Sequence, residues 1–413
     1  MVENNKKSKV VVIGGGAAGL MAAGRLNQRG RQVVLVEKNP MLGKKLRITG
    51  KGRCNITNIC DIEDILKNVT VNQSFLYSAL YTFTNENLIA LLNEYGLETK
   101  TERGGRVFPV SDSARDVVET LKKYALGPNV RLIKKEVSKL LIKDGAVCAI
   151  EYKSGEKLYC DSVIVATGGL SYPLTGSTGD GYKFARSVGH TIISPKPSLV
   201  PVQTREKWPS KLMGLALKNV KLTVTNSKGK KVFEDFGEML FTHFGISGPM
   251  VLSASAHIRD IDKENYTFHI DLKPALDERQ LDERLQRDFA QNMNKHFINA
   301  LDALLPKALI PIAVERSGID GHKCVNQISK EERLLFVRLL KDFTLHASCF
   351  RPIDEAIVTA GGVSTKEINP STMESKLIRG LYFAGEIIDV DAYTGGFNLQ
   401  IAFSTGYLAG DHA

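Results

Sequence analysis

The apolar positions near the start of the chain predict a β-α-β unit. Four consecutive apolar residues, 10–13, lead directly into Gly14-Gly15-Gly16-Ala17-Ala18-Gly19, and a second apolar run, 33–36, ends at Glu37. Unbroken apolar runs of this length are typical of parallel strands that are buried on both faces. The residues between the two runs favour a helix. We therefore expect a strand, a helix and a second strand over residues 10–37.

Apolar spacing along the rest of the chain predicts a first domain that is left and then re-entered. The expected helices lie at 75–96, 113–126, 281–289, 331–342 and 398–410. The expected strands lie at 130–133, 137–142, 147–152, 157–160, 162–166, 220–225, 266–272, 355–363 and 380–386. Prolines at 195, 197 and 201 indicate a crossing between domains. Because glycine-ended strands return near the end of the chain, the middle is expected to be an insertion.

The glycines of the first turn have the spacing Gly-x-Gly-x-x-Gly that suits a dinucleotide. Gly14 permits the tight turn, Gly16 lets the backbone approach a pyrophosphate, and Gly19 lets the helix pack closely on the strand. The N-terminus of the helix offers free N–H groups and a positive dipole end to the phosphates. Glu37 is placed to accept hydrogen bonds from an adenosine ribose. An ordinary glycine-rich turn would not explain the strand, the spacing and the acid together.

Three further segments favour a flavin as the dinucleotide. Residues 43–58 carry glycines with interleaved Lys and Arg, which suit a backbone wrapped around a pyrophosphate and ribityl chain. Residues 166–169 follow the expected meander, where flavin-binding domains approach the nucleotide again. Residues 384–389 and 394–398 precede the last helix, whose N-terminus would stabilise negative charge on a reduced flavin ring. A basic loop, a strand-ending turn and a capping acid are the purely structural alternatives.

A second complete Gly-x-Gly-x-x-Gly is missing from the sequence, because residues 176–181 lack its spacing and its flanking strands. We therefore expect no separate nicotinamide-binding domain. NAD(P)H would bind transiently over the flavin, and NADH, NADPH and oxygen all stay open as its redox partner.

Seven motifs spread over the chain form a specific combination. They are the turn at 14–19 and the segments 48–55, 105–109, 166–169, 241–249, 359–363 and 395–400. In this combination the chain resembles, over essentially its whole length, the BaiN/YhiN-like family of bacterial NAD(P)/FAD-dependent oxidoreductases. The family tends to have Gly where Ala392 stands and often has Tyr where Phe397 stands, so the flavin loop is expected to differ in detail.

The resemblance implies an α/β fold of the glutathione-reductase type. Its FAD-binding Rossmann-like domain would comprise residues 1–195 and 346–413. A β-barrel-like domain at 196–275, expected to meet the substrate, and a small helical domain at 276–345 would be inserted into it. FAD is expected to be bound non-covalently, with NAD(P)H as a transient electron donor and without a metal.

The resemblance also implies which residues surround FAD. They are Gly14, Gly16, Ala17, Ala18, Gly19, Glu37, Lys38, Lys45, Leu46, Thr49, Gly50, Arg53, Cys54, Asn55, Val137, Ala166, Thr167, Gly168, Gly385, Glu386, Asp389, Gly396, Phe397, Asn398 and Leu399. Among these, Glu386 could hold a ribityl hydroxyl. Cys54 and His243 are the candidate proton donors, and their alternatives are a packed thiol and a histidine that fixes a loop.

Charge and cysteine content restrict the kinds of partner and the cellular compartment that we expect. Lys and Arg exceed Asp and Glu by 10, which permits an RNA partner but equally fits a solvated basic surface. Arg47, Lys51, Arg53 and Arg106 could contact phosphate or substrate, with solvation as the alternative. The six cysteines have no zinc-type spacing, and no apolar run approaches a membrane span. We expect reduced thiols, a cytoplasmic protein and no membrane partner, while the oligomeric state stays open.

The family's substrates leave three functions open. The first is reduction of an activated C=C bond, in a uridine of large-subunit (23S) ribosomal RNA or in a 3-oxo-bile-acid-like enone. The second is oxidation of an amine of the aminoacetone type, with oxygen as the electron acceptor. The third is a non-catalytic, flavin-dependent RNA-binding protein. The basic surplus favours ribosomal RNA over the other substrates.

Overall fold

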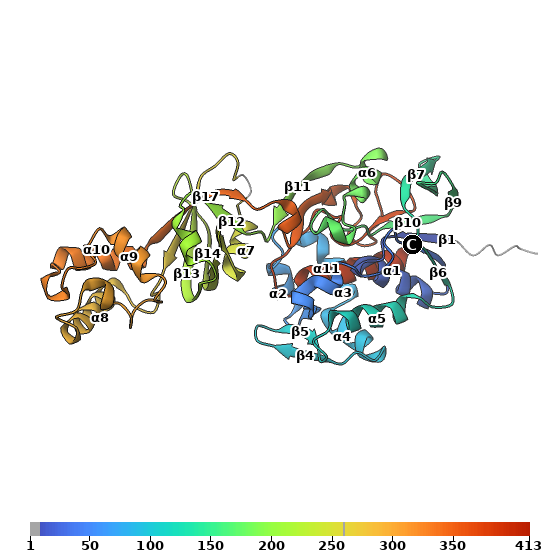
Figure 1. Ribbon diagram of the computed structural model, residues 1–413. Helices are drawn as coiled ribbons and strands as arrows, with labels where there is room; N and C mark the ends of the chain where they lie inside the picture. The colour runs from blue at the N-terminus through green and yellow to red at the C-terminus, as the bar shows by residue number, and fades with distance from the viewer. Residues whose placement is uncertain (1–8, 259–260) are drawn as a thin grey trace, which may run out of the picture. The chain divides into compact units, whose positions relative to one another are not determined.

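The computed structural model describes residues 9–258 and 261–413 of the chain (Figure 1). It divides into two compact units. Unit 1 contains the described residues up to 198 together with residues 352–413, and unit 2 contains residues 199–351 without 259 and 260. Unit 1 is therefore built from both ends of the chain, and unit 2 is inserted between them.

Unit 1 is organised around a five-stranded parallel sheet in the order β19-β10-β1-β2-β6. These strands are β1 (Lys9–Ile13), β2 (Gln32–Val36), β6 (Val130–Ile133), β10 (Ser162–Val165) and β19 (Leu381–Phe383). Strands β1, β2, β10 and β19 are almost entirely buried, which explains why their sequences are unbroken apolar runs. Strand β19 comes from the C-terminal segment and completes the edge beside β10.

Two helices from opposite ends of the chain pack against each other in unit 1. They are α1 (Ala17–Gln28) and α11 (Phe397–His412), which lie side by side in Figure 1. The backbones approach so closely that a Cβ on Gly406 would lie 2.4 Å from the Ala18 carbonyl oxygen. A Cβ on Gly410 would lie 2.7 Å from the Ala22 carbonyl oxygen. Small residues thus let the last helix dock onto the nucleotide helix.

Smaller elements surround this core. The meander consists of β7 (Val137–Lys143), β8 (Ala146–Tyr152) and β9 (Lys157–Tyr159). A second small sheet joins β3 (Thr57–Asn58), β5 (Arg106–Pro109) and β4 (Thr99–Glu102), and a third pairs β11 (Ile192–Ser198) with β18 (Val358–Val363). The remaining helices are α2 (Ile62–Lys67), α3 (Tyr77–Thr82), α4 (Asn85–Glu94), α5 (Ala114–Ala125) and α6 (Asp180–Ser187).

The structure corrects one local prediction and refines another. The helix expected at 75–96 is broken, because Thr84 begins a new helix through a capping box with Asn87. The chain passes from unit 1 to unit 2 after Ser198, within the predicted proline cluster, but the prolines at 195 and 197 themselves lie inside β11, whose register shifts between Ile193 and Lys196. A two-stranded sheet has only edge strands, where a residue without an N–H is tolerated.

Unit 2 contains a closed six-stranded barrel in the order β12-β15-β14-β13-β16-β17. Its strands are β12 (Val202–Thr204), β13 (Ala216–Asn226), β14 (Lys231–Phe241), β15 (Gly245–Ser247), β16 (Tyr266–Asp271) and β17 (Phe343–Phe350). Its helices are α7 (Pro249–Ser255), α8 (Glu278–Gln291), α9 (Ile310–Ser317) and α10 (Lys330–Lys341). Barrel and helices share one buried apolar cluster. The fold class predicted from the sequence is confirmed, and the finer boundaries at 275 and 345 stay a prediction.

Candidate functional site

The first glycine turn of unit 1 is closely packed on one side and open on the other. A Cβ on Gly14 would lie 2.4 Å from the Ala166 carbonyl oxygen, and a Cβ on Gly19 would lie 1.8 Å from the Gly14 carbonyl oxygen. A Cβ on Gly16, by contrast, would meet no atom of residues 9–258 and 261–413 within 4 Å. Gly16 caps α1 without a side-chain hydrogen bond, and the first turn of α1 has no acidic residue. The N–H groups at the start of α1 are therefore available to an anion.

Glu37 lies at the end of β2, with its carboxylate against this turn. One carboxylate oxygen accepts a hydrogen bond from the backbone N–H of Gly15 at 2.7 Å. The other accepts from the backbone and side-chain amides of Asn39 at 2.7 and 2.8 Å. The neighbouring Lys38 instead forms an ion pair with Asp180 at 2.6 Å. Glu37 is thus fixed at the glycine turn, whereas the charge of Lys38 is compensated by a carboxylate.

The loop after β2 is a tight basic segment with left-handed residues. Lys51 and Cys54 have φ values of 58° and 61°, a conformation that non-glycine residues rarely adopt. The Cys54 side chain is fully buried, and this burial raises the pKa of its thiol to about 11, against a lowering hydrogen bond from Thr49. Arg53 turns toward Glu102 and Asp112, whose hydrogen bonds raise the pKa of its guanidinium. The Arg53 charge is therefore already compensated within the protein.

Lys45 and Glu386 form a partly buried ion pair that links this loop to the C-terminal segment. The Lys45 Nζ lies 2.6 Å from a Glu386 carboxylate oxygen. The other oxygen accepts from Ser171 Oγ and from the backbone N–H of Thr359, both at 2.9 Å. Burial would raise the pKa of Glu386, but the Lys45 charge and these hydrogen bonds outweigh it and lower the pKa. Both carboxylate oxygens of Glu386 are consequently engaged by groups of the protein itself, in its ionised form.

The start of α11 lies in a strained glycine turn. Gly395 and Gly396 have φ values of 138° and 100°, and a Cβ on Gly396 would lie 2.3 Å from the Thr57 carbonyl oxygen. The side chain of Asn398 folds back onto Ala392, accepting from its N–H and donating to its carbonyl oxygen at 2.9 and 2.6 Å. The first turn of α11 contains no acidic residue and no side-chain cap. Its free N–H groups provide a second anion-stabilising helix end in unit 1.

Two buried polar atoms near these turns test whether a flavin dinucleotide fits. The side-chain oxygens of Asn55 and Thr167 are buried and have no hydrogen-bond partner among the described residues. Buried polar atoms are nearly always paired, so atoms of this kind call for a ligand with hydroxyl or amide groups. With the open space at Gly16 and two uncapped helix ends, the residues present fit FAD.

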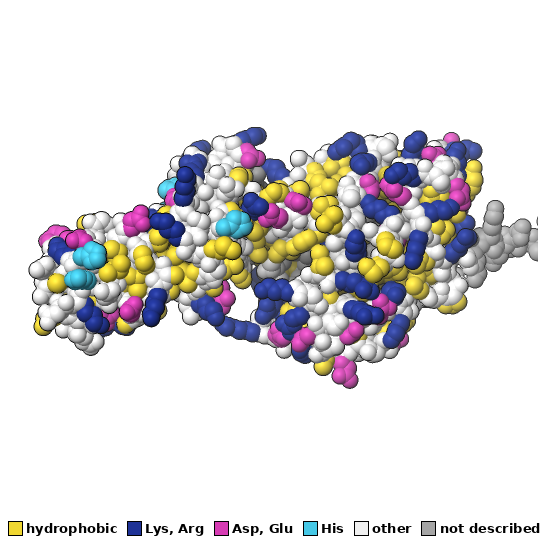
Figure 2. All heavy atoms as spheres, viewed as in Figure 1, with side chains coloured by type: hydrophobic (Ala, Val, Ile, Leu, Met, Phe, Trp, Pro, Cys, Tyr) yellow, Lys and Arg dark blue, Asp and Glu magenta, His cyan; other side chains and the backbone are white. Residues whose placement is uncertain are grey.

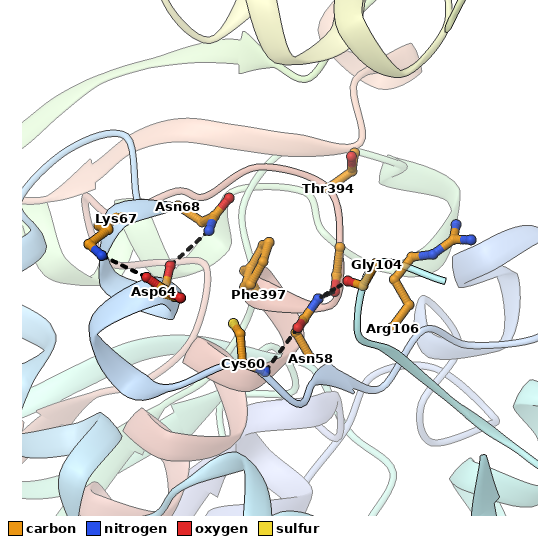
Figure 3. A pocket seen from close by; sticks show the side chains of 10 residues that line it. Asn58, Cys60, Asp64, Lys67, Asn68, Gly104, Arg106, Thr394 and Phe397 are labelled. Carbon is orange, nitrogen blue, oxygen red and sulfur yellow. Dashed lines mark hydrogen bonds and ion pairs between the residues drawn. The ribbon is translucent and has the colours of Figure 1, made fainter. Parts of the chain in front are cut away.

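A cavity of about 420 Å³ opens beside the start of α11 (Figure 3). Its wall includes Asn58, Cys60, Lys67, Arg106, Thr394 and Phe397. Asn58 supports the wall, since its side-chain amide donates to the carbonyl oxygens of Gly104 and Gly395 at 2.9 and 3.2 Å. Sequence reasoning missed Cys60 and Lys67, whereas Asn58 and Thr394 lie in the segments 43–58 and 394–398 that it singled out. Spacing alone does not bring these segments and the motif at 105–109 together.

The sequence-predicted FAD residues all belong to unit 1. Ala17 and Ala18 begin α1, Val137 begins β7, and Phe397 and Leu399 lie in the first turn of α11. Leu46 and Ala166 are buried, and Gly50, Gly168 and Gly385 have positive φ. Asp389 accepts hydrogen bonds from Asn72.

The two candidate proton donors lie in different units. Cys54 belongs to the core of unit 1. His243 is exposed in unit 2, on the turn between β14 and β15, with its ring 4.9 Å from that of Phe244. The six cysteines are all free, as the sequence predicted.

Comparison with known proteins identifies the family. The family described as "HI0933-like protein Rossmann domain" matches residues 8–412. This chain belongs to that family. A ribosomal RNA dihydrouridine synthase of Haemophilus influenzae is 35% identical over 404 residues, which are 95% of this chain and 94% of that protein. A 3-dehydro-bile acid delta(4,6)-reductase of Clostridium scindens is 32% identical, over 95% of this chain and 96% of that protein.

Comparison with solved structures supports the fold. A 3-ketosteroid delta1-dehydrogenase from Sterolibacterium denitrificans matches with a TM-score of 0.53 and 14% identity, over 98% of this chain and 99% of that one. This HI0933-like protein is thus an FAD-dependent oxidoreductase with a Rossmann-like FAD-binding fold. None of the helices within residues 9–258 and 261–413 has the length and apolar character to cross a bilayer.

Proposed function

We propose that this HI0933-like protein is an NAD(P)H-dependent reductase of an activated C=C bond, and that its substrate is a uridine in 23S ribosomal RNA. One observation carries the proposal. Two relatives that match the chain along its whole length have names that denote saturation of conjugated double bonds, one in RNA and one in a bile acid. The substrates differ completely, so the shared property is the reaction. The surplus of 10 basic residues favours RNA.

The basic residues are distributed in a way that suits a contact with an extended anion. In Figure 2 the Lys and Arg side chains are spread over the visible face of unit 1, with Asp and Glu among them. A uridine inside a folded RNA must leave its base stack before a ring atom can be reduced. Such a base would need an open pocket, and unit 1 contains one beside α11.

FAD, when bound, supplies the hydride and accepts one from the nicotinamide donor. The chain's own residues have three tasks. The N–H groups at the start of α1 would hold the pyrophosphate, and those at the start of α11 would face the flavin ring and favour negative charge there. The Lys45–Glu386 pair holds the basic loop and the C-terminal segment in place. The remaining carbon of the double bond needs a proton, for which Cys54 or His243 is the proposed source.

Anaerobic spectroscopy and RNA mapping test this function. We expect NADPH or NADH to bleach the flavin absorbance of the purified protein, and a uridine-containing ribosomal RNA fragment to restore it. Mass spectrometry of ribosomal RNA from cells with and without the gene should reveal one uridine that gains two hydrogen atoms. Bleaching by an amine, with reoxidation only by oxygen, would instead establish the amine oxidase. We place the protein in the cytoplasm, where free thiols, reduced nicotinamides and ribosomes coexist.

A further inference from the structure

The cavity beside α11 has one wall that is basic and one that is apolar. Figure 3 places the Phe397 ring between the side with Lys67 and Asp64 and the side with Gly104 and Arg106. Phe397 is the first residue of α11. The cavity therefore combines an aromatic surface with the Arg106 guanidinium, a donor for an anion.

Arg106 is the cation of this wall that remains available. Of the arginines that the sequence marked as possible phosphate contacts, Arg47 pairs with Glu119 at 3.0 Å and Arg53 pairs with two carboxylates. Arg106 donates its Nε to the carbonyl oxygen of Arg103 at 3.1 Å, and across residues 9–258 and 261–413 no carboxylate lies within ion-pair distance of it. Its two terminal nitrogens can thus serve a ligand, for which a planar guanidinium suits phosphate.

Lys67 contributes less, because Asp64 neutralises it at 2.7 Å and both side chains are largely exposed. The uncharged polar side chains of the wall belong to Asn58, Asn68 and Thr394. Asn68 donates its side-chain amide to the Asp64 carbonyl oxygen at 2.8 Å. A ring that carries N–H and carbonyl groups, with a phosphate attached, matches this set of contacts.

We propose that this cavity is a nucleotide subsite, in which a heteroaromatic ring lies against Phe397 and a phosphate is bound by Arg106. The inference rests on the proposed function for its choice of ligand, since RNA and a reduced nicotinamide dinucleotide both present this chemistry. A bile-acid-like enone has neither a heteroaromatic ring nor a phosphate, so it would not need the contact with Arg106.

Cys60 provides a direct reporter of occupancy, because it is half-buried in the cavity wall. Its alkylation is followed by mass spectrometry in the FAD-loaded protein, alone and with NADPH, NADH or a short single-stranded oligoribonucleotide. Burial and Asp64 raise the pKa of the Cys60 thiol, so the reaction is run as a long pulse. Cys148, half-buried on β8 and outside the cavity wall, is the internal reference and should react at the same rate throughout.

Variants of two neighbouring arginines separate a specific contact from general charge. Arg106→Ala should weaken binding of the ligand that protects Cys60 roughly tenfold or more, because a charge-assisted hydrogen bond is lost. Arg103→Ala removes an exposed arginine of the same turn that does not line the cavity, and it should leave the affinity unchanged. Arg106→Lys should weaken binding less than Arg106→Ala does, because the charge remains.

The arms of the experiment also identify the source of the nucleotide. Protection of Cys60 by NADPH or NADH assigns the subsite to the electron donor, and protection by the oligoribonucleotide assigns it to the substrate. The subsite would be overturned if no ligand slowed the alkylation of Cys60 relative to that of Cys148. It would also be overturned if Arg106→Ala and Arg103→Ala lost ligand affinity equally. If the protein reduces uridine but no ligand protects Cys60, the subsite is wrong and the reductase function stands. If a ligand protects Cys60 but no double bond is reduced, the reductase function is wrong and the subsite stands.

Discussion

The Lys45 ammonium and the Glu386 carboxylate meet at 2.6 Å although they stand 341 positions apart in the chain. The carboxylate also accepts hydrogen bonds from Ser171 and Thr359, so four segments of unit 1 meet at one partly buried charge pair. The pair connects the basic loop after β2 to the segment that precedes α11. Disturbing it should therefore affect folding and flavin binding together.

Replacing one member of this pair should destabilise unit 1 more than replacing both. Lys45→Met leaves the Glu386 carboxylate without its cation, and we expect the free energy of unfolding to fall by about 1–3 kcal/mol. The double variant Lys45→Met with Glu386→Gln should regain part of this loss, because no uncompensated charge remains. Chemical denaturation of the apoprotein measures both values. Strictly additive losses would show that the two side chains are not coupled.

Acidification should remove the contribution of Glu386 in a defined pH range. Its pKa is lowered on folding, so its stabilisation is present above the ordinary carboxyl value of 4.5 and is lost as the pH falls through the lowered folded value. We expect the difference in melting temperature between the wild type and Glu386→Gln to shrink below about pH 4.5. Thermal unfolding across this range tests the sign. A difference that stays constant with pH would contradict it.

Two glycines of the first turn should respond to alanine in opposite ways. A Cβ on Gly16 enters space that is free of protein atoms, at a backbone φ of −87° that alanine adopts readily. Gly16→Ala should therefore leave the apoprotein stable but weaken FAD binding roughly tenfold or more, because the methyl group would occupy the space of the ligand. Gly19→Ala would put its Cβ 1.8 Å from the Gly14 carbonyl oxygen and should destabilise the apoprotein itself. Unfolding curves and FAD titration separate the two effects, and unchanged FAD affinity in Gly16→Ala would remove Gly16 from the site.

Cys54 can be tested as a proton donor by separating the two half-reactions. With a pKa raised to about 11, its thiol keeps its proton at neutral pH and can donate it. Cys54→Ala should leave flavin reduction by NADPH unchanged and slow reduction of the double bond by roughly a hundredfold or more. Stopped-flow absorbance measures each step. If only His243→Asn slows the second step, the role belongs to His243.

Local sequence patterns were sufficient to predict the elements that are determined by residues close together in the chain. The apolar runs, the Gly14–Gly19 spacing and Glu37 predicted the first β-α-β unit because they act within a few residues of each other along the sheet. The break at Thr84 escaped prediction, since the helical spacing of 75–96 continues across it and only the Asn87 side chain makes the cap. The prolines at 195–201 lie where the chain passes to unit 2, but they hid the strand β11, because only its pairing with β18 shows that it lies at a sheet edge that tolerates proline.

The cavity beside α11 illustrates what the sequence does not contain. Its wall combines β3, the turn before β5 and the start of α11, which the Asn58 amide connects through two backbone carbonyl oxygens. Nothing in the residues around Asn58 indicates those distant partners. Likewise, the arginines at 47, 53 and 106 look alike in the sequence, and only the positions of their carboxylates distinguish them.

The pairing of β19 with β10 has a consequence for how the protein is made. Residues 199–351 are synthesised, with every strand of their barrel, before β19 and α11 leave the ribosome. The nucleotide sheet, although begun first, must wait for its last strand and for the helix that covers α1. A nascent chain halted before residue 381 should thus present a finished barrel and an incomplete flavin domain with its hydrophobic edge uncovered.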